Sequence, residues 1–412
     1  MTAPFEALRG TGVTVRPAEP GDAVAGVMPR WVALPRTTAE VSALMRVSAG
    51  HDLAVVPAGD GTKLAWGNPP ERCDLLLRTG RLTLDGETTV EHSPGDLVVR
   101  VCAGLPLGAL ASFPGIAQEL ALDNPLGAGT VGGTLATGVA GPRRFRYGTA
   151  RDLLIGVTVV LADGTAATSG GRVVKNVAGY DLGKLLCGSY GTLGVVTEAV
   201  FRLHPSPPER RWITVGLGRE PDPFTALDGL VADLTASQAE PCAVEVDWPG
   251  DGDGPLVTAL VEGTAAGERA TAVRELARGR PAWTGNGAPG WWNTLPGDPG
   301  GALCELRLPP AEVGRALRAV TACEPSVRIR GSAASGVLWA APPPEALPAF
   351  VPAVRDRLGV LGGHLVVLAA PYGRDEGIDR WGPSGALPLM RRVKERFDPD
   401  RRMSPGRFVG GI

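Results

Sequence analysis

A glycine-bent loop at residues 57–64 is the first stretch whose residue types could bind a ligand. It reads PAGDGTKL and follows a short apolar run at 53–56. Successive backbone N–H groups in such a turn can form a concave nest that suits a pyrophosphate, and Thr62 can add a hydroxyl donor. A carboxylate at Asp60 would repel phosphate, so we expect that side chain to point outward. Taken alone, the loop is better explained as a surface turn.

A second glycine-dense stretch runs from Asn124 to Pro205. Its glycines and small residues alternate with strand-like apolar runs at 155–161 and 195–203. Glycine lets backbone N–H groups approach a ligand with no side chain in the way, and it reaches positive φ. A long series of such positions suggests an extended anionic ligand held mainly by backbone. A dinucleotide fits that description.

A nicotinamide Rossmann site is the obvious alternative, because residues 127–132 (GAGTVG) satisfy G-x-G-x-x-G. However, a turn, Asp123-Asn124-Pro125, precedes the pattern where a buried strand is required. Asp152 also precedes its strand, whereas the ribose-binding acid should end one. The context therefore disfavours a Rossmann site.

Several motifs in this stretch resemble the FAD domain of the vanillyl-alcohol-oxidase type of flavoproteins. They are residues 125–138 (PLGAGTVGGTLATG), 147–152 (YGTARD) and 188–197 (GSYGTLGVVT). Within that superfamily, residues 175–182 (KNVAGYDL) are similar to a motif of 2-hydroxy-acid dehydrogenases. Residues 141–144 (GPRR) look most like the FAD-binding subunit of glycolate oxidase. With a closing FDP…SPGR at 397–407, the resemblance covers most of the chain.

The resemblance implies an α+β fold: a two-lobed PCMH-type FAD-binding domain plus a cap domain with an antiparallel sheet. It makes 57–64 the pyrophosphate loop, with Asp60 where the family usually has a small neutral residue. No histidine stands in this loop, where members with covalent flavin carry theirs, so non-covalent FAD is expected. The residues assigned to FAD binding are Pro57, Ala58, Gly59, Asp60, Gly61, Thr62, Lys63, Leu64, Pro125, Gly129, Thr130, Gly132, Gly133, Ala136, Thr137, Tyr147, Gly148, Asp152, Gly194, Val195 and Val196.

Residues 204–208 (HPSPP) break all periodicity and predict a domain boundary. We expect an FAD-binding domain at 1–208, a cap domain at 209–384 and a returning segment at 385–412. In the middle region, a doubled strand-helix-strand-strand-helix order predicts one antiparallel sheet with helices on one face. Between its halves, loop 281–301 carries three tryptophans. We expect them to pack an interface, with partner binding or substrate closure as the alternative.

Oxidation of a 2-hydroxy acid needs a cation for the carboxylate, a base or metal for the hydroxyl proton, and flavin to accept hydride. The cation candidates are Lys175, Arg330 and Arg407, and Lys175 is favoured by its motif. We assign Lys175 and Arg407 to the substrate, although each also fits a structurally paired side chain. Catalytic relatives carry paired cap histidines for a metal. Here His364 stands alone, so no metal site is predicted, which fits the FAD-binding subunit of glycolate oxidase.

The composition excludes several other classes. The chain has 412 residues, a net charge of −2 and a pI near 6.2, which does not favour nucleic acid. No apolar run approaches the roughly 20 residues that span a bilayer. The six cysteines are scattered with no C-x-x-C pair, which argues against disulfides, zinc or an iron–sulfur cluster held by this chain. We expect a cytoplasmic protein, peripheral at the membrane through partners.

Three functions fit these features. The first is the FAD-binding subunit of a multi-subunit 2-hydroxy-acid (glycolate) oxidase, acting with a second flavin subunit and an iron–sulfur subunit. The second is a free-standing FAD-dependent oxidase of an alcohol or hydroxy acid. The third is a flavin-binding scaffold without chemistry of its own.

The absence of a histidine from loop 57–64 predicts that FAD is held without a covalent bond. Acid precipitation of the purified yellow protein should therefore release the colour into the supernatant. Flavin that stays in the pellet would contradict the non-covalent attachment, and a folded but colourless protein would contradict the fold.

Overall fold

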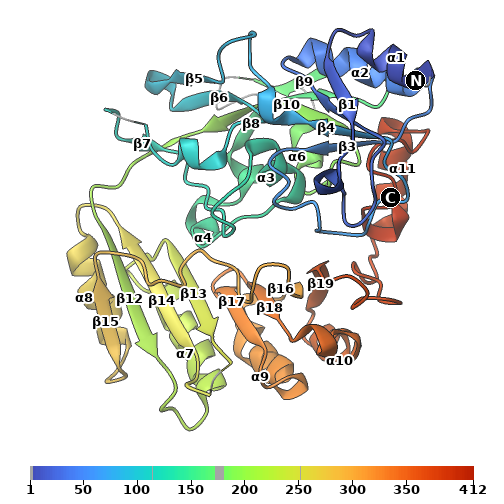
Figure 1. Ribbon diagram of the computed structural model, residues 1–412. Helices are drawn as coiled ribbons and strands as arrows, with labels where there is room; N and C mark the ends of the chain where they lie inside the picture. Colours follow the sequence, from blue (N-terminus) through green and yellow to red (C-terminus); the bar gives the residue numbers. More distant parts are fainter. Residues whose placement is uncertain (1–2, 114, 172–180, 251) are drawn as a thin grey trace.

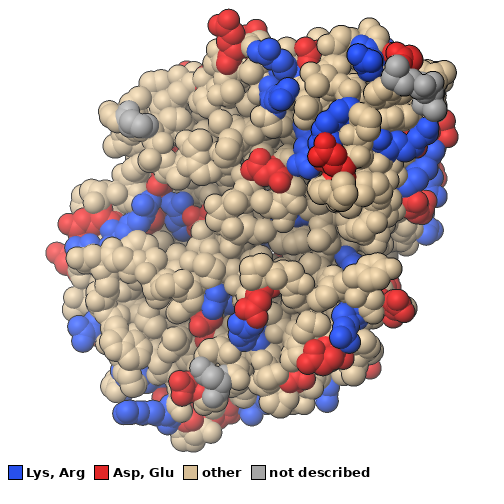
Figure 2. All heavy atoms as spheres, viewed as in Figure 1, with Lys and Arg blue, Asp and Glu red and all other residues tan. Residues whose placement is uncertain are grey.

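The computed structural model describes residues 3–113, 115–171, 181–250 and 252–412, and Lys175 lies outside the described residues. The chain forms two halves (Figure 1). The upper half holds two small sheets and the C-terminal segment, and the lower half is one large sheet with its helices. On the face shown in Figure 2, Lys and Arg side chains are interspersed with Asp and Glu. This mixture agrees with the small net charge.

The first sheet of the upper half is four-stranded in the order β1-β2-β4-β3, and its last three strands are parallel. Helix α2 begins as its sequence predicts, because Thr37 Oγ1 accepts a hydrogen bond from the backbone N–H of Glu40 at 3.2 Å. The first thirty residues show little periodicity, yet α1 and β1 form there through packing against α2 and β2. The elements are α1 Ala3–Arg9, β1 Thr14–Pro17, β2 Trp31–Leu34, α2 Thr38–Gly50, β3 Val55–Ala58 and β4 Leu75–Arg78.

The second sheet of the upper half is five-stranded and antiparallel, in the order β5-β6-β10-β8-β9. The helical pattern at 105–111 forms only a 3-10 turn, Leu107–Leu110, because Pro106 and Gly108 are poor helix formers. The elements are β5 Val90–Ser93, β6 Val98–Cys102, α3 Val131–Thr137, α4 Arg144–Tyr147, α5 Ala150–Leu153, β8 Leu154–Val160, β9 Ala166–Gly170, α6 Gly183–Leu186 and β10 Val195–Arg202, and a separate pair joins β7 Gln118–Glu119 to β11 His204–Pro205.

The lower half confirms the antiparallel sheet with helices on one face. Eight strands run in the order β15-β12-β14-β13-β17-β18-β16-β19. Strand β15, inside the tryptophan-containing loop, was not predicted, because edge pairing with β12 leaves no local pattern. The elements are β12 Arg210–Gly216, α7 Pro223–Ala236, β13 Ala243–Trp248, β14 Leu256–Glu262, α8 Ala266–Leu276, β15 Ala282–Gly285, β16 Leu303–Arg307, α9 Val313–Cys323, β17 Arg328–Ser332, β18 Val337–Ala341, α10 Leu347–Val360 and β19 His364–Ala369.

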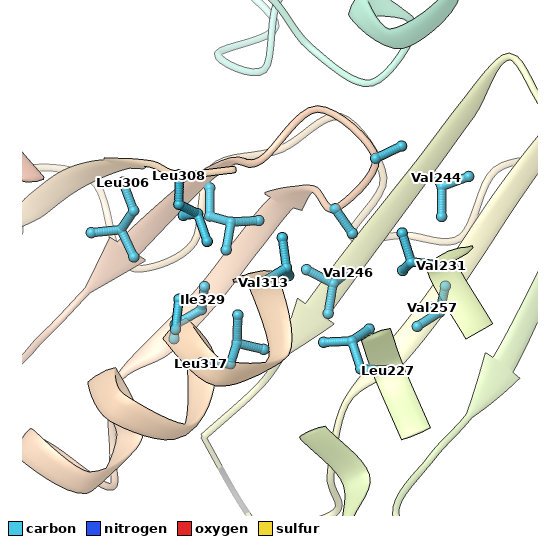
Figure 3. Close-up of a cluster of buried hydrophobic side chains, with 14 of the residues drawn as sticks. Leu227, Val231, Val244, Val246, Val257, Leu306, Leu308, Val313, Leu317 and Ile329 are labelled. Atoms are coloured by element: carbon cyan, nitrogen blue, oxygen red, sulfur yellow. The ribbon is translucent and has the colours of Figure 1, made fainter. Parts of the chain in front are cut away.

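The two faces of the large sheet differ in chemistry because side chains alternate along each strand. One face carries Val244, Val246 and Ile329, which pack against α7 and α9 in the core of the lower half (Figure 3). The opposite face carries polar residues such as Glu245 and Asp247, which are nonetheless buried at 3% and 6% exposure. The upper half covers this polar face (Figure 1).

A buried ion pair holds the C-terminal helix α11 (Leu387–Phe397) to the segment that follows it. Lys394 Nζ lies 2.7 Å from Asp398 Oδ2, and the two side chains are 4% and 0% exposed. Lys394 also donates to the carbonyls of Thr192 and Met403, at 2.8 and 2.9 Å. The segment then lies beside β3, where Val55 exchanges hydrogen bonds with the backbone of residues 402 and 404. No helix among the described residues is long and apolar enough to cross a membrane.

Substitution Lys394→Met should destabilise the fold by about 3–5 kcal/mol, because it leaves the Asp398 carboxylate buried without its cation. Urea unfolding measures the change. The control is Arg391→Met, on the exposed side of the same helix, for which we expect less than about 0.5 kcal/mol. Equal stability of the two variants would show that the ion pair does not hold this segment.

Candidate functional site

A pocket of about 780 Å³, partly open to solvent, lies in the upper half between loop 57–64, the start of α3 and the start of β10. Of the residues assigned to the cofactor, it is lined by Pro57, Ala58, Gly59, Asp60, Gly61, Thr62, Lys63, Leu64, Thr130, Gly132, Gly133, Ala136, Thr137, Gly194 and Val196. The lining also includes Arg407 and five residues that we did not assign: Val56, Thr79, Ser189, Tyr190 and Gly191. The fold thus brings stretches far apart in sequence around one volume.

Gly59 allows the loop to approach α3. A Cβ atom at this position would lie 2.0 Å from Thr130 Oγ1. Thr130 cannot easily move, because it precedes α3 and its hydroxyl accepts a hydrogen bond from the N–H of Gly133 at 3.2 Å. Asp60 is exposed, as its sequence position led us to expect. The loop and the start of α3 therefore form one continuous wall of backbone and small side chains.

Lys63 supplies the positive charge of the pocket wall. Its side chain donates to Thr62 Oγ1 at 3.2 Å, the residue is 7% exposed, and it forms no ion pair among the described residues. Burial lowers its pKa to about 8, although the charge of Asp60 acts in the opposite direction. A buried ammonium without a carboxylate suits an anionic ligand such as a phosphate.

Arg407 reaches the same pocket from the C-terminal segment. Its Nη2 donates to the carbonyls of Leu64 and Trp66, at 3.0 and 2.7 Å. Its Nη1 is buried and has no partner within the described part of the chain. Burial lowers the pKa of this guanidinium to about 10, against the opposing effect of Tyr190. The free N–H group is a donor ready for an acceptor on a bound molecule.

Tyr190 is the most informative residue that the sequence prediction missed. It is a non-glycine residue with φ of +54°, a conformation that costs energy and often marks functional sites. Its ring packs edge-on against Trp381 with centroids 4.8 Å apart. The only available signal was its place in the GSYGT motif at 188–192.

Several assigned residues lie outside the pocket lining and have other partners. The hydroxyl of Tyr147 donates to Glu262 Oε2 at 2.8 Å, across the junction of the two halves. Asp152 accepts from the backbone N–H and hydroxyl of Thr149 at the start of α5, at 2.7 and 2.8 Å. Val195 is fully buried in a core cluster. Pro125, Gly129 and Gly148 also lie outside the lining, although a Cβ at Gly129 would lie 2.8 Å from Lys63 Nζ.

The remaining candidates for substrate chemistry are accounted for by local contacts. Arg330 pairs with Asp247, with Nε and Oδ1 2.7 Å apart, so it is a paired side chain. His364 begins β19, and burial lowers its pKa. Within the described ranges, no group of three or more His, Cys, Asp and Glu side chains could hold a metal ion.

The donor set of the pocket fits FAD. Glycine-lined backbone and the Lys63 ammonium suit a pyrophosphate, and the free Nη1 of Arg407 suits a carbonyl acceptor. Residues 29–170 match the family model described as an FAD binding domain, which includes loop 57–64 and α3. This part of the chain is an FAD-binding domain, and FAD is its cofactor.

The whole fold is similar to that of solved carbohydrate oxidases. It superposes on a carbohydrate oxidase from Microdochium nivale with a TM-score of 0.73 and 17% identity, covering 97% of this chain and 98% of that one. A glucooligosaccharide oxidase from Acremonium strictum gives a TM-score of 0.72 at 17% identity, covering 98% and 97%. At this identity the likeness defines the fold alone.

Similar curated proteins point to a narrower group. Glycolate oxidase subunit GlcD of Bacillus subtilis is 33% identical over 228 residues, which cover 54% of this chain and 46% of that protein. Glycolate oxidase subunit GlcE of Escherichia coli is 40% identical over 156 residues, covering 37% and 43%. A D-2-hydroxyglutarate dehydrogenase of Xanthomonas citri is 36% identical over 185 residues, covering 44% and 38%. The chain therefore spans less than half the length of these relatives.

Substitution Lys63→Met should weaken FAD binding at pH 7 by about tenfold or more, because a charge-assisted hydrogen bond contributes roughly 1.5–3 kcal/mol. Lys63 of the free protein loses its proton above about pH 8, so wild-type affinity should fall as the pH rises through that value. The variant should lack this pH dependence. Quenching of FAD fluorescence on titration into apo protein measures both.

The control for this titration is Lys184→Met, which removes a 41% exposed lysine side chain outside the pocket. It should bind FAD like the wild type. Unchanged affinity and an unchanged pH profile in Lys63→Met would remove Lys63 from the cofactor site.

Proposed function

We propose that this chain is the FAD-binding subunit of a 2-hydroxy-acid oxidase of the glycolate oxidase type. The proposal rests on the match of residues 29–170 to an FAD binding domain, together with the names of the similar curated proteins. Those relatives are named for glycolate, D-lactate and D-2-hydroxyglutarate, which are all 2-hydroxy acids. We also propose domain boundaries after residues 208 and 384, because the large sheet and its helices lie between these positions.

In this function the chain binds and orients the flavin and the substrate, and the flavin, when bound, supplies the capacity to accept a hydride. Lys63 would neutralise phosphate charge, and Gly59 keeps the wall close enough for backbone N–H groups to contact the ligand. Arg407 would donate through Nη1, so we now assign it to the cofactor side of the pocket as well as to the substrate. The polar face of the large sheet covers the upper half and would exclude water from the reaction.

Partners are part of the proposal. All six cysteines are free thiols, and four of them are buried. Burial raises the pKa of Cys73 and Cys304 to about 12, which makes them inert thiols and poor metal ligands. Electrons would therefore leave the flavin for a separate iron–sulfur subunit, beside a second flavin subunit, in a cytoplasmic complex that is peripheral at the membrane. A free-standing oxidase is the second candidate, because the junction of the two halves has polar groups of its own.

The isolated holoprotein should be a poor catalyst. Anaerobic mixing with glycolate, D-lactate or D-2-hydroxyglutarate should bleach its flavin at least about 100-fold more slowly than the same protein co-expressed with neighbouring subunits, because a positioned base contributes roughly 10²–10⁴ in rate. Stopped-flow absorbance measures the rates.

Full-rate bleaching by the lone chain would favour the free-standing oxidase. Absence of bleaching in every preparation, including the complex, would favour a flavin-binding scaffold and contradict the proposal.

A further inference from the structure

Arg144 is a partly buried cation at the junction of the two halves. It lies on α4, which packs against β13 of the large sheet. Its Nη2 donates to the carbonyl of Ala140, and its guanidinium lies 5.6 Å from the centre of the Trp339 ring. Among the described residues no carboxylate forms an ion pair with it. Burial lowers its pKa even though the charges of Glu305 and Glu245 act to raise it.

The neighbouring Arg143, at the same junction, has its charge neutralised by carboxylates of the chain itself. It forms ion pairs with Glu119 and Asp123, at 2.6 and 2.8 Å. Two adjacent arginines thus enter the same junction, and among the described residues only Arg143 forms ion pairs with carboxylates. The charge of Arg144 is therefore available to an anionic ligand.

Glu245, on β13, faces the same junction. It is 3% exposed, and its Oε1 has no hydrogen-bond partner in the described structure. Its cross-strand neighbours, Ser332 and Thr258, are uncharged. Burial raises the pKa of Glu245 to about 8, while Arg144 and Ser332 act to lower it and Asp123 to raise it. A buried carboxyl oxygen without a partner is costly unless a ligand completes its contacts.

Trp339 is a second buried group with an unpaired polar atom, and it connects the junction to the FAD pocket. Its indole Nε1 is buried without an acceptor among the described residues. It belongs to the same apolar cluster as Tyr190, which lines the pocket. The backbone N–H of Tyr190 donates to the carbonyl of Ala136 at 2.8 Å, and Ala136 lies in the pocket wall. Trp339 therefore lies in a cluster that borders the cofactor pocket, with the Arg144 guanidinium 5.6 Å from the centre of its ring.

We propose that Arg144, Glu245 and Trp339 form a binding site for a small hydroxy acid between the two halves. The guanidinium and the indole N–H would hold the carboxylate, and Glu245 would hydrogen-bond the hydroxyl group. A cation and a neutral N–H donor match the carboxylate of such a ligand, and a carboxyl group matches its hydroxyl. A simple anion would not need the carboxyl group. This site rests on the proposed function for its substrate class, but its residues follow from the unpaired atoms of Glu245 and Trp339 and from the position of Arg144 beside Trp339.

The test is binding of glycolate to the holoprotein, measured anaerobically by calorimetry, with acetate as the analogue that lacks the hydroxyl. Arg144→Met should lower glycolate affinity by at least about tenfold, and Arg144→Lys should restore part of it. Arg146→Met, which removes an exposed arginine from the same helix, should bind like the wild type. FAD content and melting temperature of each variant show that the pocket and the fold are intact.

The role of Glu245 is tested by pH and by ligand choice. Wild-type affinity for glycolate should fall as the pH rises through about 8, because a charged Glu245 repels the carboxylate. Glu245→Gln should lose this pH dependence, and its preference for glycolate over acetate should shrink.

Wild-type binding of glycolate that Arg144→Met leaves unchanged would overturn the site, as would an absence of binding to the wild type. If glycolate binds as expected but no 2-hydroxy acid bleaches the flavin even in the complex, the site stands and the proposed function fails.

Discussion

The structure depends on an ion network that joins its two halves. Glu119 of the upper half accepts from Arg210 of the large sheet at 2.6 Å and from Arg143 at 2.6 Å. Arg210 also pairs with Glu262 at 2.8 Å, and Glu262 accepts from Tyr147 of the upper half. Burial acts to raise the pKa of Glu262, but these hydrogen bonds outweigh it and lower the pKa. Because each charge has partners from both halves, the network fixes the large sheet over the upper half.

Most buried charges elsewhere in the described chain are satisfied in the same way. Lys394 and Asp398 hold the C-terminal segment, and Arg330 is held by Asp247. Lys63 and Arg407 line the FAD pocket and form no ion pair among the described residues, whereas Arg144 and Glu245 lie at the junction of the two halves. The unpaired Nη1 of Arg407 and Oε1 of Glu245 are a donor and an acceptor available to a bound molecule.

Sequence reasoning worked best where the physical signal is local. The doubled strand-helix-strand-strand-helix order of the middle region predicted the large antiparallel sheet with helices on one face. It failed where a segment depends on its neighbours, as for α1, β1 and β15, which gain their structure from packing or edge pairing.

The sequence by itself indicated an extended anionic ligand held by backbone, because glycine lets backbone approach a ligand, and the resemblance of its motifs to known flavoproteins identified that ligand as FAD. Only the tertiary structure decided which side chains reach that ligand. Arg407 contacts Leu64 across 343 positions, and Arg144 meets Trp339 through the packing of two halves. The structure also separated Arg143 from Arg144, although they are adjacent and chemically identical. Burial and the absence of a partner arise only when distant segments pack together, so no local pattern in the sequence can reveal them.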